Sequence, residues 1–282
     1  MKVRHPAYAG MFYEGNARSL KAQIEDCFMH KLGPKALPEV AGGKLKHVIG
    51  VISPHAGYMY SGPVAAHAYY HLAQDGKPDT IVIFGPNHTG VGSGLAIVRE
   101  GAWRTPLGDV EVDTAVADSI VRGSSIVDVD EVAHMREHSI EVQLPWLQYL
   151  YGSSFRFVPL CFLMQDFESS REVGTAVGKA LSSENALVIA STDMTHYEPQ
   201  KVAERKDKTV IDSALEMDER KLYSSVEMNQ VSMCGYGPTV AAMTAAKALG
   251  AKNGKLLCYK TSGDVVGDYS AVVGYGSLIF TR

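Results

Sequence analysis

The stretch His47-Val-Ile-Gly-Val-Ile-Ser53 is followed directly by Pro54-His55-Ala-Gly57. An apolar, β-branched run with no polar alternation is typical of a strand that helices cover on both faces. The Pro and Gly residues after it predict a turn. This stretch therefore predicts a buried strand with a histidine just beyond its carboxyl end.

The same pattern recurs twice along the chain. Thr80-Ile-Val-Ile-Phe84 leads into Gly85-Pro-Asn-His88, and Ala186-Leu-Val-Ile-Ala190 leads into Ser191-Thr-Asp-Met-Thr-His196. Strands alternating with helices predict a three-layer α/β/α sandwich around a central, mostly parallel mixed sheet. Further strands are predicted at 155–162 and 270–280, and helices at 19–32, 61–72 (with Ser61 as N-cap and Pro63 near the first position), 139–152, 170–182, 201–217 and 238–249.

Length and composition restrict the class of protein. The chain has 282 residues, 46% hydrophobic and 21% charged, with no linker-like stretch, so we expect one domain over 1–282. A net charge of -4 argues against a nucleic acid partner. No apolar run reaches the roughly 20 residues that cross a bilayer. Without a secretory signal or a CxxC pair, the four separated cysteines predict a cytoplasmic protein.

Three histidines follow the three predicted strands. The carboxyl ends of parallel strands meet at one edge of a sheet, where ligands bind. His55, His88 and His196 are therefore expected to lie in one cleft. Any one of them alone would be better explained as a surface or core histidine. Chance would scatter three of them over other positions, so together they predict a site.

Cys234 comes just before the alanine-rich helix predicted over 238–249. Unpaired N–H groups at a helix N-terminus favour the thiolate over the thiol. A thiolate binds metals or attacks electrophiles. The alternative, a small residue in a Gly-rich turn, stays open.

The stretch Arg136-Glu-His-Ser-Ile-Glu141 is predicted to open a helix. His138 and Glu141 are three residues apart, which would place them on one helix face. A helix-capping role for this group is an open alternative to a role in the site. Asp193, three residues before His196, is predicted to hold that imidazole in one tautomer.

Several motifs, taken in chain order, resemble a known family. They are Ala9-Gly10-Met-Phe-Tyr13, Ser53-Pro-His-Ala-Gly-Tyr58 with Gly62, Gly85-Pro-Asn-His88, Arg104-Thr-Pro-Leu107, Glu137-His-Ser-Ile-Glu141 with Leu144-Pro145, Ser191-Thr-Asp-Met-Thr-His196 and Cys234-Gly235. The series resembles the Memo family, the mediator of cell motility proteins and their archaeal and bacterial relatives. Because six or more motifs occur in order over nearly the whole chain, the resemblance is specific.

The resemblance implies a fold similar to the catalytic subunit of class III extradiol dioxygenases, non-haem iron enzymes that cleave catechol rings. It implies a metal site of His55, His88 and Cys234, with His196 as acid or base and iron or copper as the metal. The dioxygenases use two histidines and a carboxylate. A cysteine in third place is softer and also suits zinc, so ring cleavage is not carried over.

Three functions are compared. The first is a metal-dependent redox protein or enzyme acting on a small-molecule substrate, in which His196, Asp193 and Cys234 take part in the chemistry. In it, Tyr58, His138 and Glu141 would contact the substrate or the metal ligands. The alternative is a non-catalytic scaffold that binds a peptide or small ligand in the same cleft. The third is a metal-free enzyme with Cys234 as nucleophile. No feature of the sequence indicates an oligomeric state.

Overall fold

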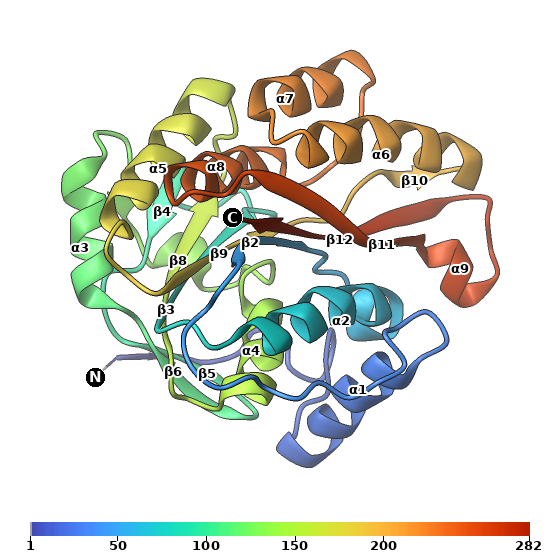
Figure 1. Ribbon diagram of the computed structural model, residues 1–282, viewed down its shortest axis with the longest axis horizontal. Coiled ribbons are helices and arrows are strands. Elements are labelled where there is room, and N and C mark those ends of the chain that lie inside the picture. Colours follow the sequence, from blue (N-terminus) through green and yellow to red (C-terminus); the bar gives the residue numbers. More distant parts are fainter. Residues whose placement is uncertain (1) are drawn as a thin grey trace.

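A computed structural model describes residues 2–282, which contain one large sheet with helices on both faces (Figure 1). In spatial order its strands are β10 (His196–Glu198), β12 (Val272–Thr281), β2 (Val48–Ser53), β9 (Ala186–Ser191), β3 (Thr80–Pro86), β8 (Arg156–Phe162), β4 (Leu95–Ile97) and β7 (Asp128–Val129), and β11 (Asn253–Thr261) also pairs with β12. A smaller sheet is formed by β1 (Val3–Arg4), β5 (Ala102–Thr105) and β6 (Gly108–Glu111).

The predicted mixed sheet is confirmed, and its parallel part is the centre. Strands β2, β9, β3 and β8 pair in parallel, so their carboxyl ends share one edge. Strand β12 pairs antiparallel with β2 on one side, and β4 pairs antiparallel with β8 on the other. The three histidines that follow β2, β3 and β9 therefore start from the same edge of the sheet.

The helices form two layers, one against each face of the large sheet (Figure 1). The hydrophobic core on one face contains side chains from α1 (Ala17–Met29), α2 (Tyr58–Asp75) and α4 (Leu144–Tyr151). The core on the other face contains side chains from α3 (Thr114–Gly123), α5 (Phe167–Ala180), α6 (Gln200–Leu215), α7 (Glu219–Met228) and α8 (Tyr236–Ala248). Short helical turns complete the fold: η1 (Val132–His134), η2 (Glu141–Gln143) and α9 (Ser262–Val266).

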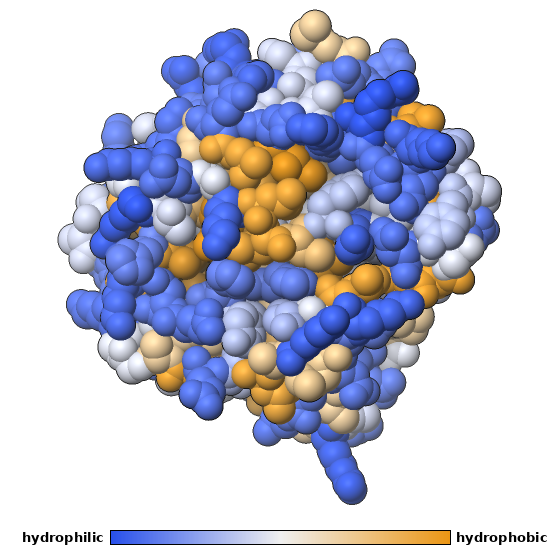
Figure 2. Space-filling model, turned by 45° about the vertical axis from the view of Figure 1, so that its right-hand side comes forward, coloured by the Kyte–Doolittle hydropathy of each residue, from blue (hydrophilic) through white to orange (hydrophobic). Residues whose placement is uncertain are grey.

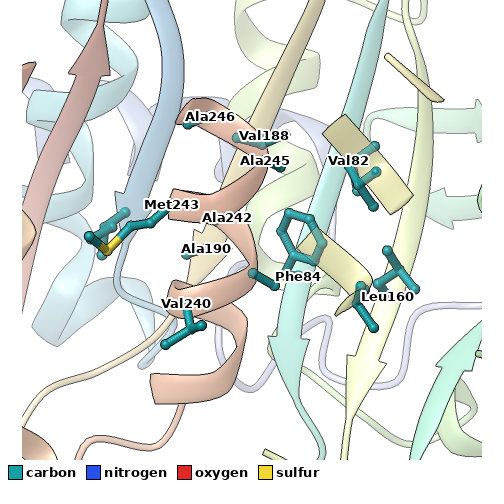
Figure 3. Close-up of a cluster of buried hydrophobic side chains, with 14 of the residues drawn as sticks. Val82, Phe84, Leu160, Val188, Ala190, Val240, Ala242, Met243, Ala245 and Ala246 are labelled. Carbon is teal, nitrogen blue, oxygen red and sulfur yellow. The ribbon is translucent and has the colours of Figure 1, made fainter. Parts of the chain in front are cut away.

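The side chains of β3 alternate between the two faces of the sheet, which explains why its apolar run is unbroken. Ile81 and Ile83 belong to the core under α2, whereas Val82 and Phe84 belong to the core under α8. Successive side chains of a strand point to opposite faces, so a strand covered on both faces needs an apolar residue at every position. Figure 3 shows Val82 and Phe84 beside the alanine-rich helix α8.

Helix α2 begins earlier than the sequence predicted, so the predicted start of this helix was wrong. The helix runs from Tyr58, so Pro63 lies inside it and Ser61 does not cap it. The Tyr58 N–H donates to the carbonyl of Phe12 at 2.8 Å. This contact from a distant segment satisfies one of the donors that a side-chain cap would otherwise serve.

Elements that the sequence did not predict are short or covered on one side only. Strands β4 and β7 have three and two residues, too few to show a period. Strand β11 has both exposed and half-buried positions. The predicted helix 139–152 is reduced to η2 and α4, because residues 136–140 are not helical.

The surface combines a hydrophilic exterior with one apolar hollow in the face that Figure 2 shows. None of the helices found in residues 2–282 is both long enough and apolar enough to cross a membrane. Cys27, Cys161, Cys234 and Cys258 are all free thiols.

Candidate metal centre

Three imidazoles converge at the carboxyl edge of the central strands. His55 follows β2, His88 follows β3, and His138 lies in the turn before η2. One donor atom of each lies within 4.8 Å of the others, a separation that would let them hold one metal ion. The ring centroids are 5.1 Å apart for His55 and His88 and 4.5 Å apart for His88 and His138. The structure thus brings together two of the three strand-end histidines, with His138 as the third member.

Hydrogen bonds set the tautomer of His55. Its Nδ1 lies 3.1 Å from Oγ of Ser191. That hydroxyl donates its only proton to the Ser139 carbonyl and accepts from the Gln143 amide at 2.7 Å. A hydroxyl with its proton committed can only accept further bonds, so Nδ1 of His55 carries the hydrogen. Nε2 of His55 is therefore the unprotonated nitrogen.

Glu137 performs the same task for His88 and also lies beside the ring of His138. Its Oε1 lies 2.9 Å from Nδ1 of His88 and 3.3 Å from Nδ1 of His138. An ionised carboxylate only accepts hydrogen bonds, so Nδ1 of His88 carries the hydrogen and Nε2 of His88 has the free lone pair. Carboxylates and carbonyls orient metal-bound histidines in this manner.

The surroundings of Glu137 keep its carboxyl group ionised. Burial raises its pKa, but the hydrogen bond and charge of His88, the charge of His138 and backbone N–H donors outweigh this and lower it to about 2. The N–H groups of His88, His138 and Ser139 donate to it at 2.5, 2.8 and 2.8 Å. Sequence reasoning assigned no role to Glu137. Its one signal was its place directly before His138 within a quoted motif.

Two of the site histidines, His55 and His138, are kept neutral. Burial and the charge of His88 lower the pKa of His55 well below its ordinary value. Burial and the charge of His55 lower the pKa of His138 to about 3. Neutral imidazole is the form that coordinates metals, so at neutral pH these side chains need no deprotonation to act as ligands.

Cys234 lies beside this group without belonging to it. Its Sγ is 3.2 Å from Nε2 of His55 and accepts from the Asp193 N–H at 3.2 Å. Burial and the charge of Asp193 raise the pKa of the thiol. The expectation of a thiolate stabilised by the following helix is therefore wrong in the metal-free protein. The N–H of Gly235, the residue next to Cys234, already donates to the Thr192 hydroxyl at 2.9 Å.

Asp193 does not orient His196 as predicted. Nδ1 of His196 lies 2.8 Å from the carbonyl of Ser232, which assigns the hydrogen to Nδ1. Asp193 instead accepts from the His55 N–H at 2.9 Å, and its other oxygen lies 3.8 Å from Nε2 of His55. The physical reason is that residues 192–195 form no helix, so residues three apart do not share a face. His196 still lies close enough for its charge to lower the pKa of His55.

Glu141 and Tyr58 support the site from the core. The prediction that Glu141 shares a helix face with His138 is wrong, because His138 precedes the helical turn. Glu141 is fully buried and pairs with Arg4 at 2.7 Å. It also accepts hydrogen bonds from Ala7, Tyr8 and Tyr13. The Tyr58 hydroxyl donates to the Val142 carbonyl at 2.7 Å. Both residues thus fix the segments that flank His138.

The fold and the imidazole group define a three-layer α/β protein with a candidate metal centre at the carboxyl edge of its sheet. A family model described as Memo-like protein matches residues 4–279, so the chain belongs to the Memo-like protein family. MEMO1 family proteins of Methanopyrus kandleri and Methanothermobacter thermautotrophicus are 54% and 51% identical to it over 99% and 98% of this chain, in each case covering 99% of the relative.

A solved structure shows the same fold at low sequence identity. It is an uncharacterised protein of Escherichia coli K12, 14% identical, with a TM-score of 0.57 over 82% of this chain and 99% of that one. At this identity the similarity concerns the fold alone.

Proposed function

We propose that this chain binds iron or copper through His55, His88 and His138, with Cys234 as a further ligand, and acts as a metal-dependent redox enzyme. The observation that carries the proposal is the set of hydrogen bonds at Nδ1. Ser191 and Glu137 hold the hydrogen there on His55 and His88, which leaves two Nε2 lone pairs, close to a donor nitrogen of His138, for one ion.

The donor set fits the metal. Imidazole nitrogen suits iron, copper and zinc, whereas magnesium and calcium prefer oxygen. The Cys234 thiol, at 3.2 Å from Nε2 of His55, is near enough to join, and metal binding would displace its proton. A thiolate added to imidazoles suits copper, iron and zinc.

The surroundings suit chemistry on a small molecule. A bound redox metal would supply Lewis acidity and electron transfer at this edge of the sheet. His196 has its hydrogen on Nδ1, held by Ser232, so its Nε2 could accept a proton from a substrate. Asp193, next to both His55 and Cys234, would keep the loop between β9 and β10 in place. The resemblance to extradiol dioxygenases supports an oxygen-dependent reaction without naming its substrate.

A non-catalytic scaffold is the second candidate. The rings of Tyr8 and Phe12 lie 5.1 and 4.7 Å from that of His138 and give the site an aromatic wall. Aromatic walls are frequent where peptides or planar ligands bind. Under this alternative, variants that lose the metal would keep full affinity for the ligand.

The test is the metal content of the protein purified without oxygen and reconstituted with Fe(II), Cu(I) or Zn(II). The variants are His88→Ala, His138→Ala and Cys234→Ser, with His71→Ala on α2 as the matched control. We expect near-stoichiometric metal in the wild type and the control, and at least a tenfold weaker affinity in the first two variants.

The variants also distinguish a site that includes Cys234 from a site of three histidines. Loss of affinity in Cys234→Ser would support the cysteine as a ligand, and an unchanged affinity would leave a site of three histidines. No uptake of any of the three metals by the wild type would contradict the proposal and favour the scaffold.

A further inference from the structure

The backbone next to His196 is strained. Tyr197 has a φ of +58°, in the left-handed region that residues other than glycine rarely adopt. Its side chain is 78% exposed, so burial of the ring does not account for this conformation. The pairing of β10 with β12 is also irregular between His196 and Glu198. Because strained residues persist only where the surrounding structure holds them, the cause lies in the contacts on either side of Tyr197.

Asp207 of α6 holds the residue before His196. It is fully buried, and its Oδ1 accepts hydrogen bonds from the N–H and the hydroxyl of Thr195 at 2.9 and 2.6 Å. The other oxygen, Oδ2, accepts from the Tyr259 hydroxyl of β11 at 2.7 Å. A Cβ at Gly274 of β12 would clash with Oδ2, so this strand packs directly against the carboxylate. The carboxylate thus has fixed neighbours on β11 and β12, and it holds Thr195 in place.

Lys206, the preceding residue of α6, holds the residue after Tyr197. Its Nζ donates to Oε1 of Glu198 at 2.6 Å and to the Gln230 carbonyl at 3.0 Å. The side chains of Lys206 and Glu198 are both mostly buried, so the ion pair is partly shielded from solvent. Gln230 is itself strained, with a φ of +50°. Lys206 thus joins two strained segments, one at Tyr197 and one at Gln230.

The segment that begins at Gln230 carries the hydrogen-bond partner of His196. The His196 N–H donates to the Ser232 hydroxyl at 2.7 Å, and Nδ1 of its ring lies 2.8 Å from the Ser232 carbonyl. Helix α6 therefore holds His196 from two directions, through its own strand β10 and through the segment that orients its ring. A buried carboxylate is costly unless its hydrogen bonds are satisfied. Two of the three side-chain and backbone donors to Asp207 belong to Thr195, so this carboxylate mainly serves the segment next to His196.

We propose that Asp207 and Lys206 are positioning residues for His196. They fix the backbone before and after it and the segment of Ser232, so that the imidazole stays beside the metal centre with its hydrogen on Nδ1. This assignment rests on the proposed function, in which Nε2 of His196 accepts a proton from a substrate. The left-handed conformation of Tyr197 is what these two anchors impose on the chain between them.

The test is the tautomer of His196, read from the ¹⁵N chemical shifts of its ring in the metal-free protein at about pH 8.5, where imidazoles of ordinary pKa are neutral. His196→Gln assigns the signals, and the test variants are Asp207→Ala and Lys206→Met. We expect the Nδ1–H form to predominate in the wild type and to fall below roughly half in both variants, because the hydrogen-bond partner decides which nitrogen carries the hydrogen. Lys206 is partly exposed, so Lys206→Met tests the proposal even where Asp207→Ala does not fold.

Each test variant has a matched control. Lys208→Met removes a lysine of the same helix, whose ion pair with Asp212 is exposed. Asp207→Asn keeps a side-chain oxygen that can accept both hydrogen bonds from Thr195. We expect both controls to keep the tautomer of the wild type. Loss of the Nδ1–H form in either control, or its retention in Lys206→Met or in a folded Asp207→Ala, would overturn the proposal.

Loading with Co(II) distinguishes a failure of this proposal from a failure of the proposed function. Bound Co(II) shifts the NMR signals of nearby protons, so we expect large shifts of the His196 ring protons in the wild type and the loss of most of this shift in Lys206→Met. A wild type that takes up no Co(II) would contradict the proposed metal centre, whereas the tautomer would still decide whether α6 positions the ring. Equal shifts in the wild type and Lys206→Met would overturn the positioning role and leave the metal centre intact.

Discussion

At the scale of single residues, the site depends on the atoms that face away from the metal position. A histidine can bind a metal through either ring nitrogen, and its hydrogen-bond partner decides which. Here Ser191 and Glu137 assign the hydrogens. Glu137 has the largest share, because one of its oxygens accepts from the His88 imidazole and from two backbone N–H groups and lies 3.3 Å from Nδ1 of His138.

Glu137→Gln is predicted to weaken metal affinity by roughly 10–100-fold, because the amide removes the charge that holds His88 and His138. The readout is metal affinity by competition with a chelator, on variants whose folding is checked by circular dichroism. Glu131→Gln, at the exposed ion pair with Lys2, is the matched control. An unchanged affinity in Glu137→Gln would show that the imidazoles orient themselves without this carboxylate.

At the scale of elements, strand ends and close contacts bring the ligands together. His55 and His88 arrive on neighbouring loops because β2 and β3 both lie beside β9. The loop that carries His138 reaches them because β3 has a glycine, Gly85, next to its last residue. A Cβ at Gly85 would lie 2.5 Å from Oγ of Ser139 and 2.8 Å from a side-chain carbon of Ile140. Ser139 instead donates to the Pro86 carbonyl at 2.8 Å.

Gly85→Ala is therefore predicted to lower the free energy of unfolding by about 1–3 kcal/mol, the usual cost of overpacking. It should also weaken metal binding, since the displaced loop carries His138. Chemical denaturation and metal titration measure the two effects. Gly42→Ala is the control, since a Cβ there has no neighbour within 4 Å. A Gly85→Ala variant that matches the Gly42→Ala variant in both measurements would refute the role given to this contact.

At the scale of the whole molecule, burial of polar groups makes stability depend on pH. Burial and the charge of Arg4 lower the pKa of His134 to about 4. An exposed histidine in the unfolded chain titrates near 6.5. As pH falls from about 6.5 to about 4, the unfolded chain takes up a proton that the folded protein refuses, so stability decreases. Below about pH 4 both states are protonated, and this residue adds no further loss.

Between pH 7 and pH 4 the metal-free wild type is predicted to lose about 3 kcal/mol of stability through His134. The measurement is urea denaturation at several pH values for the wild type and His134→Phe. The variant should show a smaller decrease with falling pH, whatever its stability at pH 7. Parallel pH profiles for the two proteins would mean that His134 titrates normally in the folded state.

The amino-acid sequence by itself determined the central layers and part of the site. Unbroken apolar runs specify β2, β3 and β9, because strands covered on both faces need apolar residues at every position. The histidines after these strands predicted the edge where the site lies. These are local signals, since each depends on a few adjacent residues.

The tertiary structure alone decided which groups meet there. Glu137 and His138 come from a turn with no periodic pattern, and the close approach at Gly85 places them beside His88. Asp193 accepts a hydrogen bond from the His55 N–H, and Nδ1 of His196 bonds to the Ser232 carbonyl instead. His134 is buried because the segment around η1 folds against β5, where its ring lies 5.6 Å from that of Trp103. Such contacts join residues far apart in the chain, and their energies depend on packing that no local stretch encodes.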